Sequence, residues 1–345
     1  MAFWAGKRVL VTGHTGFKGA WLSEILLGRG AEVFGLALPP EGDPALFNQL
    51  ALAARLDHAV TDLRDADAVA VRVAQAAPDV VFHLGAQSLV QRSYRQPVET
   101  WGTNVMGTIH LMQALAGLGR PVATVIVTTD KVYENREWVH GYRETDALGG
   151  HDPYSASKAA TELAVHAWRS SFPGLWLATA RAGNVIGGGD WAEDRILPDL
   201  ARAFAAGRPL ALRNPGSTRP FQHVLEPLMG YLFLAERLSS GDPRWQTAFN
   251  FGPEPGDIRT VRDLVRAAME VWPGDWVHAS NPDAPHEAGR LALTIDKARH
   301  DLAWTPRWDI ARGLAETVGW YRAVHDGADP AALTRAQIAA HEAGS

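Results

Sequence analysis

The feature that most limits the fold of this chain is a glycine-rich loop near its beginning. A short apolar run, residues 7–13, ends in the first of three glycines, Gly13, Gly16 and Gly19. Glycines at this G-x-x-G-x-x-G spacing allow a tight turn and let a pyrophosphate approach the amino terminus of the following helix. We therefore expect a strand, a turn and a helix that bind a dinucleotide, with Lys18 adding a charge for the phosphates. The alternative is a helix that merely packs closely on a strand.

The residues after the second expected strand bear on which dinucleotide is bound. Dinucleotide folds usually carry an acid about 20 residues beyond the loop for the adenosine ribose, but the strand over 31–38 ends without one. No arginine or lysine lies between Glu32 and Ala45 to pair with a 2′-phosphate, so we expect NAD rather than NADP. Asp62, after the third strand, is expected to hydrogen-bond the adenine, or else only to cap a helix.

Strands and helices alternate through the first half of the chain. Apolar runs without polar alternation are typical of strands buried on both faces of a parallel sheet. Right-handed crossovers then give an α/β fold with a doubly wound parallel sheet, the Rossmann arrangement. We expect strands over 7–13, 31–38, 58–63, 79–86, 121–129 and 175–183, and helices from about 17 and over 65–77, 97–118 and 155–170.

The alternation stops after about residue 184, where glycine and charge predict a loop over 183–199. Residues 221–238 and 247–252 are expected to form a helix and a strand that return to the sheet. A chain of 345 residues is long for one domain, so we expect two. We expect an NAD-binding Rossmann domain over 1–183 plus about 220–252, and a second, smaller α/β substrate-binding domain over about 184–219 plus 253–345.

The composition excludes several classes of protein. The chain has no cysteine, which rules out disulfides and thiolate metal sites, and we expect no metal. The net charge of −5 gives no electrostatic reason to expect a nucleic acid or an anionic membrane as partner. No run approaches 18 apolar residues, and the first strand leaves no room for a signal peptide, so we expect a cytoplasmic protein.

A second motif, DPYSASKAATEL at 152–163, places Tyr154 and Lys158 four residues apart at the start of a helix. This spacing puts both side chains on one face. The ammonium group is expected to lower the phenol pKa from about 10 toward neutrality. A phenolate can then take a proton from a sugar hydroxyl while hydride leaves the same carbon. The alternative is a solvated helix face.

A third motif, TTDKVYEN at 128–135, follows the fifth expected strand. Within four residues it contains two hydroxyls, a carboxylate and an ammonium group. An acid beside a base at the end of a buried strand suits proton transfer to and from a substrate.

These motifs, together with HLGAQ at 83–87 and RAGNVIGGGDWAEDRILPD at 181–199, resemble the extended short-chain dehydrogenase/reductases. Four further segments resemble the CDP-glucose 4,6-dehydratase subgroup: HTGFKGAWL, NREWVHGYRE, RPFQHVLEP and PHEA. The resemblance covers residues from about 6 to 322. It implies an enzyme of deoxysugar and polysaccharide biosynthesis that uses bound NAD to convert CDP-glucose into its 4-keto-6-deoxy form and water. Hydride leaves carbon 4, water is eliminated across carbons 5 and 6, and hydride returns to carbon 6.

The resemblance also assigns catalytic roles. Tyr154 is the base at the 4-hydroxyl, and Lys158 tunes it and holds the nicotinamide ribose. Thr129 hydrogen-bonds the 4-oxygen. Asp130 protonates the leaving hydroxyl, so we expect it to be protonated part of the time because burial disfavours a carboxylate.

The base that removes the carbon-5 proton has two candidates. Many sugar-nucleotide dehydratases have a glutamate where this chain has Lys131, as the CDP-glucose subgroup does. A lysine can be the base only when neutral, which burial favours and an ionised Asp130 opposes, so we expect the two groups to share a proton. Glu134 is the alternative base, and we prefer Lys131.

Further residues are expected to bind ligands. For the cofactor we expect Gly13, Thr15, Gly16, Phe17, Lys18, Gly19, Asp62, Leu63, Leu84, Ala86, Gln87, Thr128, Tyr154 and Lys158. For the substrate we expect Gln87, Ser88, Asn184, Arg195, Arg213, Asn214, Arg219, His286 and Glu287, with Arg290 as a further candidate for the pyrophosphate. His83 and Asn104 are expected to be structural.

Two other functions stay open at this point. Another nucleotide-sugar dehydratase or a 4-epimerase would share the glycine loop and the tyrosine–lysine pair, although an epimerase needs no acid and base after Thr129. A non-catalytic NAD-binding regulator is the third possibility. The helices over 97–118 and 155–170 resemble the pair that forms a dimer interface in the superfamily, so we expect a homodimer or a dimer of dimers.

Overall fold

The structure is a computed structural model that describes residues 3–279 and 289–344. Seven parallel strands form its central sheet in the order β11-β6-β5-β4-β1-β2-β3. Their bounds are β1 Arg8–Thr12, β2 Glu32–Ala37, β3 Asp57–Val60, β4 Val80–His83, β5 Ala123–Val127, β6 Trp176–Ala182 and β11 Ala248–Phe251. All six strands expected in the first half are present, and 247–252 supplies the seventh, so the doubly wound α/β fold is confirmed.

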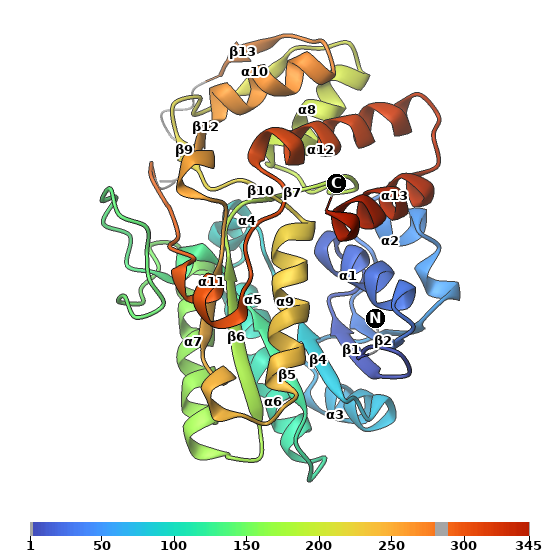
Figure 1. The fold of residues 1–345 in the computed structure, drawn as a ribbon, viewed down its shortest axis with the longest axis vertical. Coiled ribbons are helices and arrows are strands. Elements are labelled where there is room, and N and C mark those ends of the chain that lie inside the picture. The colour runs from blue at the N-terminus through green and yellow to red at the C-terminus, as the bar shows by residue number, and fades with distance from the viewer. Residues whose placement is uncertain (1–2, 280–288, 345) are drawn as a thin grey trace.

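Helices cover both faces of the sheet (Figure 1). On one face, α1 (Phe17–Gly28) and α9 (Leu225–Leu238) share a core with Val9 and Val11 of β1. On the other face, α3 (Ala66–Ala76), α6 (Gly107–Ala116) and α7 (Pro153–Ser171) pack on Leu10 and its neighbours. Alternate residues of β1 therefore lie in different cores, which explains why the strand carries no polar alternation.

The expected helix over 97–118 is not one regular helix. It consists of α5 (Pro97–Trp101), a π-helical segment (Gly102–Met106) and α6. In the π-helical segment the carbonyl of Asn104 accepts hydrogen bonds from Thr108 Oγ1 at 2.7 Å and Thr161 Oγ1 at 3.0 Å. These two hydroxyls satisfy the Asn104 carbonyl where the wider turn changes the regular backbone hydrogen bonding.

Several segments after β6, among them α8, α10 and α12, form a second group of elements at the top of Figure 1, where α12 packs against α8 and α10. The predicted loop over 183–199 is wrong at its end, because α8 begins at Ile196. The remaining elements are short strands and helices: β7 Val185–Ile186, α8 Ile196–Ala205, β8 Leu210–Leu212, β9 Thr218–Arg219, β10 Gln222–His223, β12 Arg259–Thr260, α10 Val261–Val271, β13 Trp276–His278, α11 Asp296–Leu302, α12 Ile310–His325 and α13 Pro330–Ala343.

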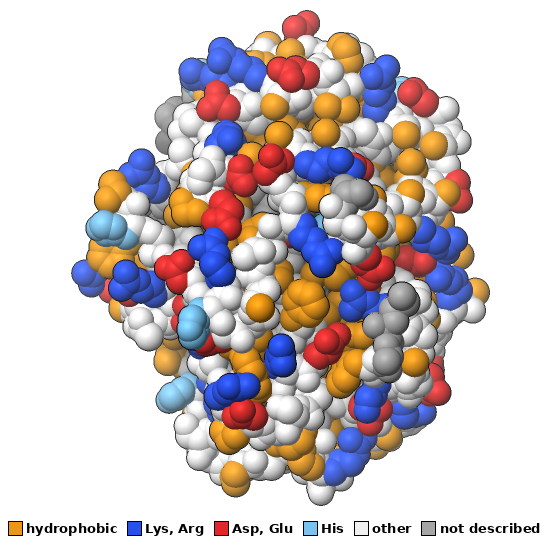
Figure 2. All heavy atoms as spheres, in the orientation of Figure 1, with side chains coloured by type: hydrophobic (Ala, Val, Ile, Leu, Met, Phe, Trp, Pro, Cys, Tyr) orange, Lys and Arg blue, Asp and Glu red, His pale blue; other side chains and the backbone are white. Residues whose placement is uncertain are grey.

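The surface carries charges of both signs. Figure 2 shows basic and acidic side chains interspersed over the face that Figure 1 presents. This face therefore offers no extended field of one sign that would attract a polyanion or a polycation. Among residues 3–279 and 289–344, every helix is too short or too polar to cross a bilayer.

Candidate active site

The glycine loop has the geometry that a bound pyrophosphate needs. Gly13 has φ +73°, and a Cβ there would lie 2.7 Å from the backbone nitrogen of Gly85. A Cβ on Gly19 would lie 2.1 Å from the carbonyl oxygen of Gly13, so α1 can approach the loop only with glycine at this position. Gly16 is the exposed N-cap of α1, and a Cβ there would meet only the Gly13 oxygen, at 3.4 Å. The amino end of α1 is thus open to a phosphate group, and the loop fits a dinucleotide.

In the region expected to bind adenosine, Asp62 has a partner within the chain, and its contact with adenine stays a prediction. The carboxylate of Asp62 forms an ion pair with Arg64 at 2.6 Å, and this hydrogen bond lowers its pKa. Helix α3 is capped by Asp65, which accepts from the backbone nitrogen of Ala68 at 3.0 Å, so the alternative that Asp62 caps this helix is wrong. Thr15 fastens the loop to the second strand by donating to the carbonyl of Leu38 at 2.9 Å.

Two polar residues near the ends of β4 and α5 have structural partners. The Oε1 atom of Gln87 accepts from the backbone nitrogen of Leu89 at 2.6 Å, and its Nε2 donates to Thr100 Oγ1 at 2.9 Å and to the Leu89 carbonyl at 3.1 Å. The predicted contact of this amide with cofactor or sugar would require some of these bonds to break. Asn104 bonds the backbone of Gln87 and donates to Ser157 Oγ at 2.9 Å, so its structural role beside the Tyr154 helix turn is confirmed.

His83 is also structural, as expected. Its Nδ1 lies 2.7 Å from Thr12 Oγ1, and its Nε2 lies 2.9 Å from Thr108 Oγ1. Burial and the charge of Lys158 lower its pKa to about 3, so the ring is neutral at physiological pH.

The tyrosine–lysine pair lies on the first turns of α7. Asp152 caps this helix by accepting from the backbone nitrogen of Ser155 at 2.9 Å, and Pro153 occupies its first position. Both features define where a helix begins. They place Tyr154 and Lys158 beside the carboxyl end of β5, where the Lys158 ammonium donates to the carbonyl of Val127 at 3.1 Å.

Four residues that we predicted to be catalytic lie together, and we call them the catalytic cluster: Thr129, Asp130, Lys131 and Tyr154. The hydroxyl of Thr129 hydrogen-bonds with Tyr154 and donates to Asp130 Oδ1 at 2.9 Å. Lys131 Nζ lies 3.4 Å from the same carboxylate oxygen. Asp130 is 1% exposed, and its Oδ2 has no hydrogen-bond partner among the described residues. A buried carboxylate oxygen without a partner is rare, so this atom is available to a water molecule or a ligand.

The predicted activation of the phenol is not present in this structure. Burial raises the pKa of Tyr154 to about 12, and the hydrogen bond between Tyr154 and Thr129 only partly opposes the effect. Burial also lowers the pKa of Lys158 to about 8, and the nearby carboxylate of Glu162 opposes this shift. The expectation that the ammonium brings the phenol close to neutrality is therefore wrong for the protein without ligands, because desolvation outweighs charge.

Lys18, from the glycine loop, contacts helix α9. Its Nζ lies 3.5 Å from the hydroxyl of Tyr231 on α9. Burial lowers the pKa of Lys18 to about 7, with Arg195 adding to the effect and Asp130 opposing it. The expected contact between Lys18 and a cofactor phosphate stays a prediction.

The residues expected at the substrate lie at different places. Arg195 lies near the cluster, because its charge affects the pKa of Tyr154, and its guanidinium bonds Asp190 at 2.7 Å and Ser88 Oγ at 3.5 Å. Arg213 forms an exposed ion pair with Asp194 at 3.0 Å. The Oδ1 atom of Asn184 is buried without a partner among the described residues. Arg219 donates to the Thr218 carbonyl at 2.9 Å, and Asn214 and Arg290 are exposed. His286 and Glu287 lie outside the described residues.

Sequence reasoning missed a buried ion pair next to the cluster. Glu162 lies one helical turn beyond Lys158 and bonds Arg181 of β6 at 2.8 Å. The i, i+4 spacing of Lys158 and Glu162 was the available signal, because it places a carboxylate on the same helix face.

Comparison with known proteins identifies the family. Residues 9–252 match the NAD dependent epimerase/dehydratase family. A CDP-glucose 4,6-dehydratase of Salmonella typhimurium is 45% identical over 97% of this chain and 96% of its own length. A UDP-glucose 4-epimerase of Thermus thermophilus, solved in complex with NAD, is 26% identical with a TM-score of 0.78, over 91% of this chain and 98% of the other. A dTDP-glucose 4,6-dehydratase of Bacillus anthracis, in complex with NAD, shares the fold at a TM-score of 0.79 and 20% identity, over 91% and 96% of the two chains.

The matched residues run from β1 through β11 and include the glycine loop, the catalytic cluster and the tyrosine–lysine pair. The resemblance to the extended short-chain dehydrogenase/reductases is thereby confirmed, and the chain belongs to the NAD-dependent epimerase/dehydratase family.

Proposed function

We propose that this chain is a CDP-glucose 4,6-dehydratase that binds NAD and forms CDP-4-keto-6-deoxyglucose and water. The cluster of Thr129, Asp130, Lys131 and Tyr154 carries the proposal, because it combines a base for alcohol oxidation with an acid and a second base for elimination. The relative at 45% identity supports CDP-glucose as the substrate.

The cofactor would be held by the glycine loop and α1, with Lys158 near the nicotinamide ribose. NAD, when bound, supplies the acceptor and later the donor of hydride, and its positive charge favours ionisation of a nearby phenol. Tyr154 accepts the proton of the 4-hydroxyl, and Thr129 donates a hydrogen bond to the 4-oxygen. Because Tyr154 is buried, the proton that it accepts is not exchanged directly with bulk water.

The elimination needs one proton removed from carbon 5 and one delivered to the carbon-6 oxygen. The unpartnered Oδ2 of Asp130 is suited to donate the second proton when the carboxyl is protonated. Lys131 is suited to remove the first, because its Nζ lies beside the same carboxyl group and is partly exposed. The side chain of Glu134 is 54% exposed and pairs with Arg136 at 3.2 Å, which favours Lys131 over Glu134 as the base.

The nucleotide of the substrate would lie across the second group of elements. We propose that residues 184–219 and 253–345 bind it, and that residues 1–183 and 220–252 bind NAD. Arg195 and Arg219 offer guanidinium groups suited to the pyrophosphate, and Asn184 offers an unpartnered oxygen. Arg213, Asn214, Ser88 and Arg290 remain candidates.

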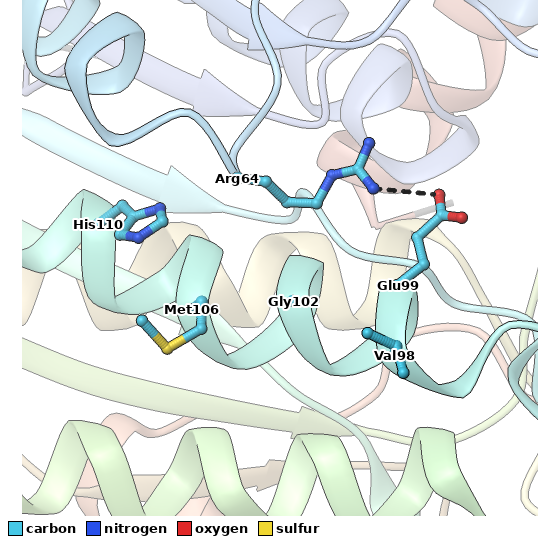
Figure 3. A pocket seen from close by; sticks show the side chains of 6 residues that line it. All are labelled: Arg64, Val98, Glu99, Gly102, Met106 and His110. Carbon is cyan, nitrogen blue, oxygen red and sulfur yellow. Dashed lines mark ion pairs between the residues drawn. The ribbon is translucent and has the colours of Figure 1, made fainter.

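We further propose that the protein is a homodimer formed through α5, α6 and α7. A pocket of about 580 Å³ lies along α5, the π-helical segment and α6. Figure 3 shows the residues that line it, which are Arg64, Val98, Glu99, Gly102, Met106 and His110. Val98 is 85% exposed, and Leu163 of α7 is 59% exposed, so these helices present apolar side chains that a second copy would cover. We also propose that the enzyme works in the cytoplasm, which fits the absence of cysteine.

Incubation with CDP-glucose tests the function. We expect a product whose 4-keto group absorbs in base, and in deuterated water mass spectrometry should find one solvent deuteron at carbon 5. Parallel reactions contain UDP-glucose and dTDP-glucose. Turnover of one of these instead of CDP-glucose would overturn the substrate assignment, and CDP-galactose as the product would identify a 4-epimerase.

A further inference from the structure

The turn that carries Thr129, Asp130 and Lys131 of the catalytic cluster is held at both ends by one buried ion pair. At its start, Thr128 Oγ1 donates to Glu162 Oε1 at 2.5 Å. At its end, Arg181 Nη1 donates to the hydroxyl of Tyr133 at 2.9 Å. Glu162 and Arg181 bond each other at 2.8 Å, so a continuous path of hydrogen bonds joins residue 128 to residue 133 around the outside of the turn.

The pair has further hydrogen-bond partners, although Arg181 Nε has none among the described residues. Glu162 and Arg181 are 5% and 4% exposed. Thr179 Oγ1 donates to Glu162 Oε2 at 2.8 Å, and Tyr133 donates to Asn250 Oδ1 at 2.6 Å. Glu162 therefore accepts three hydrogen bonds, which is what a buried carboxylate needs to stay ionised. Burial alone would raise the pKa of Glu162, but Arg181 and the two hydroxyls outweigh it and the pKa is lowered.

Glu162 lies one helical turn after Lys158 on α7, which places both side chains on one face of the helix, and both are 5% exposed. Burial lowers the pKa of Lys158 to about 8, and the charge of Glu162 opposes that shift. The other titratable groups nearby do not favour the ammonium: His83 on β4 is neutral, Lys18 on α1 brings a like charge, and Tyr154 is protonated. Arg181 is held ionised by Glu162 and adds a further positive charge to this region.

We propose that Glu162 and Arg181 are positioning residues that fix the catalytic turn at both ends, and that Glu162 keeps the Lys158 ammonium charged. Neither residue touches substrate or cofactor in this assignment. The charge on Lys158 is a property of the protein without ligands, whereas the effect on the turn rests on the proposed dehydratase activity. The two parts can therefore be tested separately.

The charge on Lys158 can be measured without substrate. The chain contains five lysines, Lys7, Lys18, Lys131, Lys158 and Lys297, so protein labelled with ¹³C at lysine Cε gives few signals, and Lys158→Met assigns the relevant one. We expect Glu162→Gln to lower the Lys158 midpoint by about 1 pH unit or more, because a buried carboxylate is replaced by a neutral amide of the same shape. Glu162→Asp should restore most of the shift. An unchanged midpoint in Glu162→Gln, with near-native circular dichroism, would overturn this part.

The effect on the turn is tested by two threonine variants. Thr128→Val and Thr179→Val each remove one hydroxyl that donates to Glu162, but only Thr128 adjoins the turn. We expect kcat for dehydration to fall at least tenfold in Thr128→Val and less than threefold in Thr179→Val. Neither variant should lower the titration midpoint of Lys158 by more than about 0.5 pH unit. Equal losses in both variants would contradict the positioning of the turn. Inactivity of the wild-type protein toward nucleotide sugars would refute the proposed function and leave the lysine result standing.

Discussion

At the scale of single residues, the acid and the base that we propose for the elimination are neighbours in the chain that differ in burial. Asp130 is enclosed, with one carboxylate oxygen bonded and the other without a described partner, whereas the side chain of Lys131 is 27% exposed. This asymmetry suits their separate tasks, because the acid must hold a proton until a leaving group arrives and the base must reach a substrate carbon.

Replacing Lys131 should separate the two halves of the proposed reaction. In Lys131→Ala we expect kcat for dehydration to fall about 10²–10⁴-fold, because the carbon-5 proton has no acceptor. Oxidation at carbon 4 should persist, seen as absorbance of reduced nicotinamide when substrate is added. Glu134→Ala is the matched control three positions on, and it should keep activity within about threefold of wild type since its side chain pairs only with Arg136 among the described contacts. A large loss of dehydration in Glu134→Ala and a small one in Lys131→Ala would make Glu134 the base.

Residue types at the site could be predicted from the sequence, but most of their partners could not. Tyr154 and Lys158 were found because their spacing fits one helix face, a local property. The bond between Glu162 and Arg181 joins α7 to β6, and that of Lys18 with Tyr231 joins α1 to α9. Such contacts depend on how elements pack, so a pattern along the chain does not contain them.

At the scale of elements, α1 contains two glycines with opposite surroundings. Gly19 faces the loop at close range, whereas a Cβ on Gly28 would meet nothing within 4 Å. We expect Gly19→Ala to abolish NAD binding, because its Cβ would displace the loop backbone. Gly28→Ala should bind NAD normally and gain up to about 1 kcal/mol in free energy of unfolding. Calorimetric titration with NAD and urea unfolding check both, and normal binding by Gly19→Ala would refute the geometry described for the loop.

Helix α13 is joined to the body of the protein by a buried pair. His341 Nε2 lies 2.7 Å from Glu226 Oε1 on α9, and both side chains are 1% exposed. We expect His341→Ala to lower the free energy of unfolding by about 3–5 kcal/mol, because it leaves a buried carboxylate with fewer partners. The adjacent Glu342→Ala should cost less than about 1 kcal/mol, since Glu342 forms a partly exposed pair with Arg29. Urea unfolding compares them, and equal costs would contradict this assignment.

The elements themselves were largely predictable, with two informative exceptions. Runs of apolar residues revealed the strands because both faces of the sheet are buried. The π-helical segment at Gly102–Met106 was not recognised, since the hydroxyls that support it include Thr161 from another helix. The start of α8 was missed because Arg195 provides no side-chain hydrogen bond as a cap, which leaves no signal in the sequence.

At the scale of the whole molecule, buried neutral histidines make stability depend on pH. Burial lowers the pKa of His14, His83 and His223 from 6.5 to about 3. The unfolded chain binds these protons first as the pH falls below 6.5, so the stabilisation is present at neutral pH and is lost on acidification. Each group should lower the free energy of unfolding by about 1.4 kcal/mol per pH unit below its unfolded pKa.

Urea unfolding between pH 7 and 5 tests this dependence, because carboxylates titrate mainly below that range. We expect the wild-type slope to approach about 4 kcal/mol per pH unit near pH 5, and His223→Asn to reduce it by about a third. His300→Ala is the control, since the side chain of His300 is 89% exposed, and its slope should match wild type. A flat stability profile for the wild-type protein would contradict the neutral state of the three rings.

The place of β11 in the sheet has a consequence for synthesis of the protein. β6 is followed by residues 183–247 before β11 arrives to pair with its outer edge. At about 5–20 residues per second, a ribosome needs several seconds to supply that stretch. During this interval a strand destined for the interior has one unsatisfied row of backbone donors and acceptors, which is a template for mispairing. We therefore expect the nascent chain to bind chaperones until β11 has emerged from the ribosome.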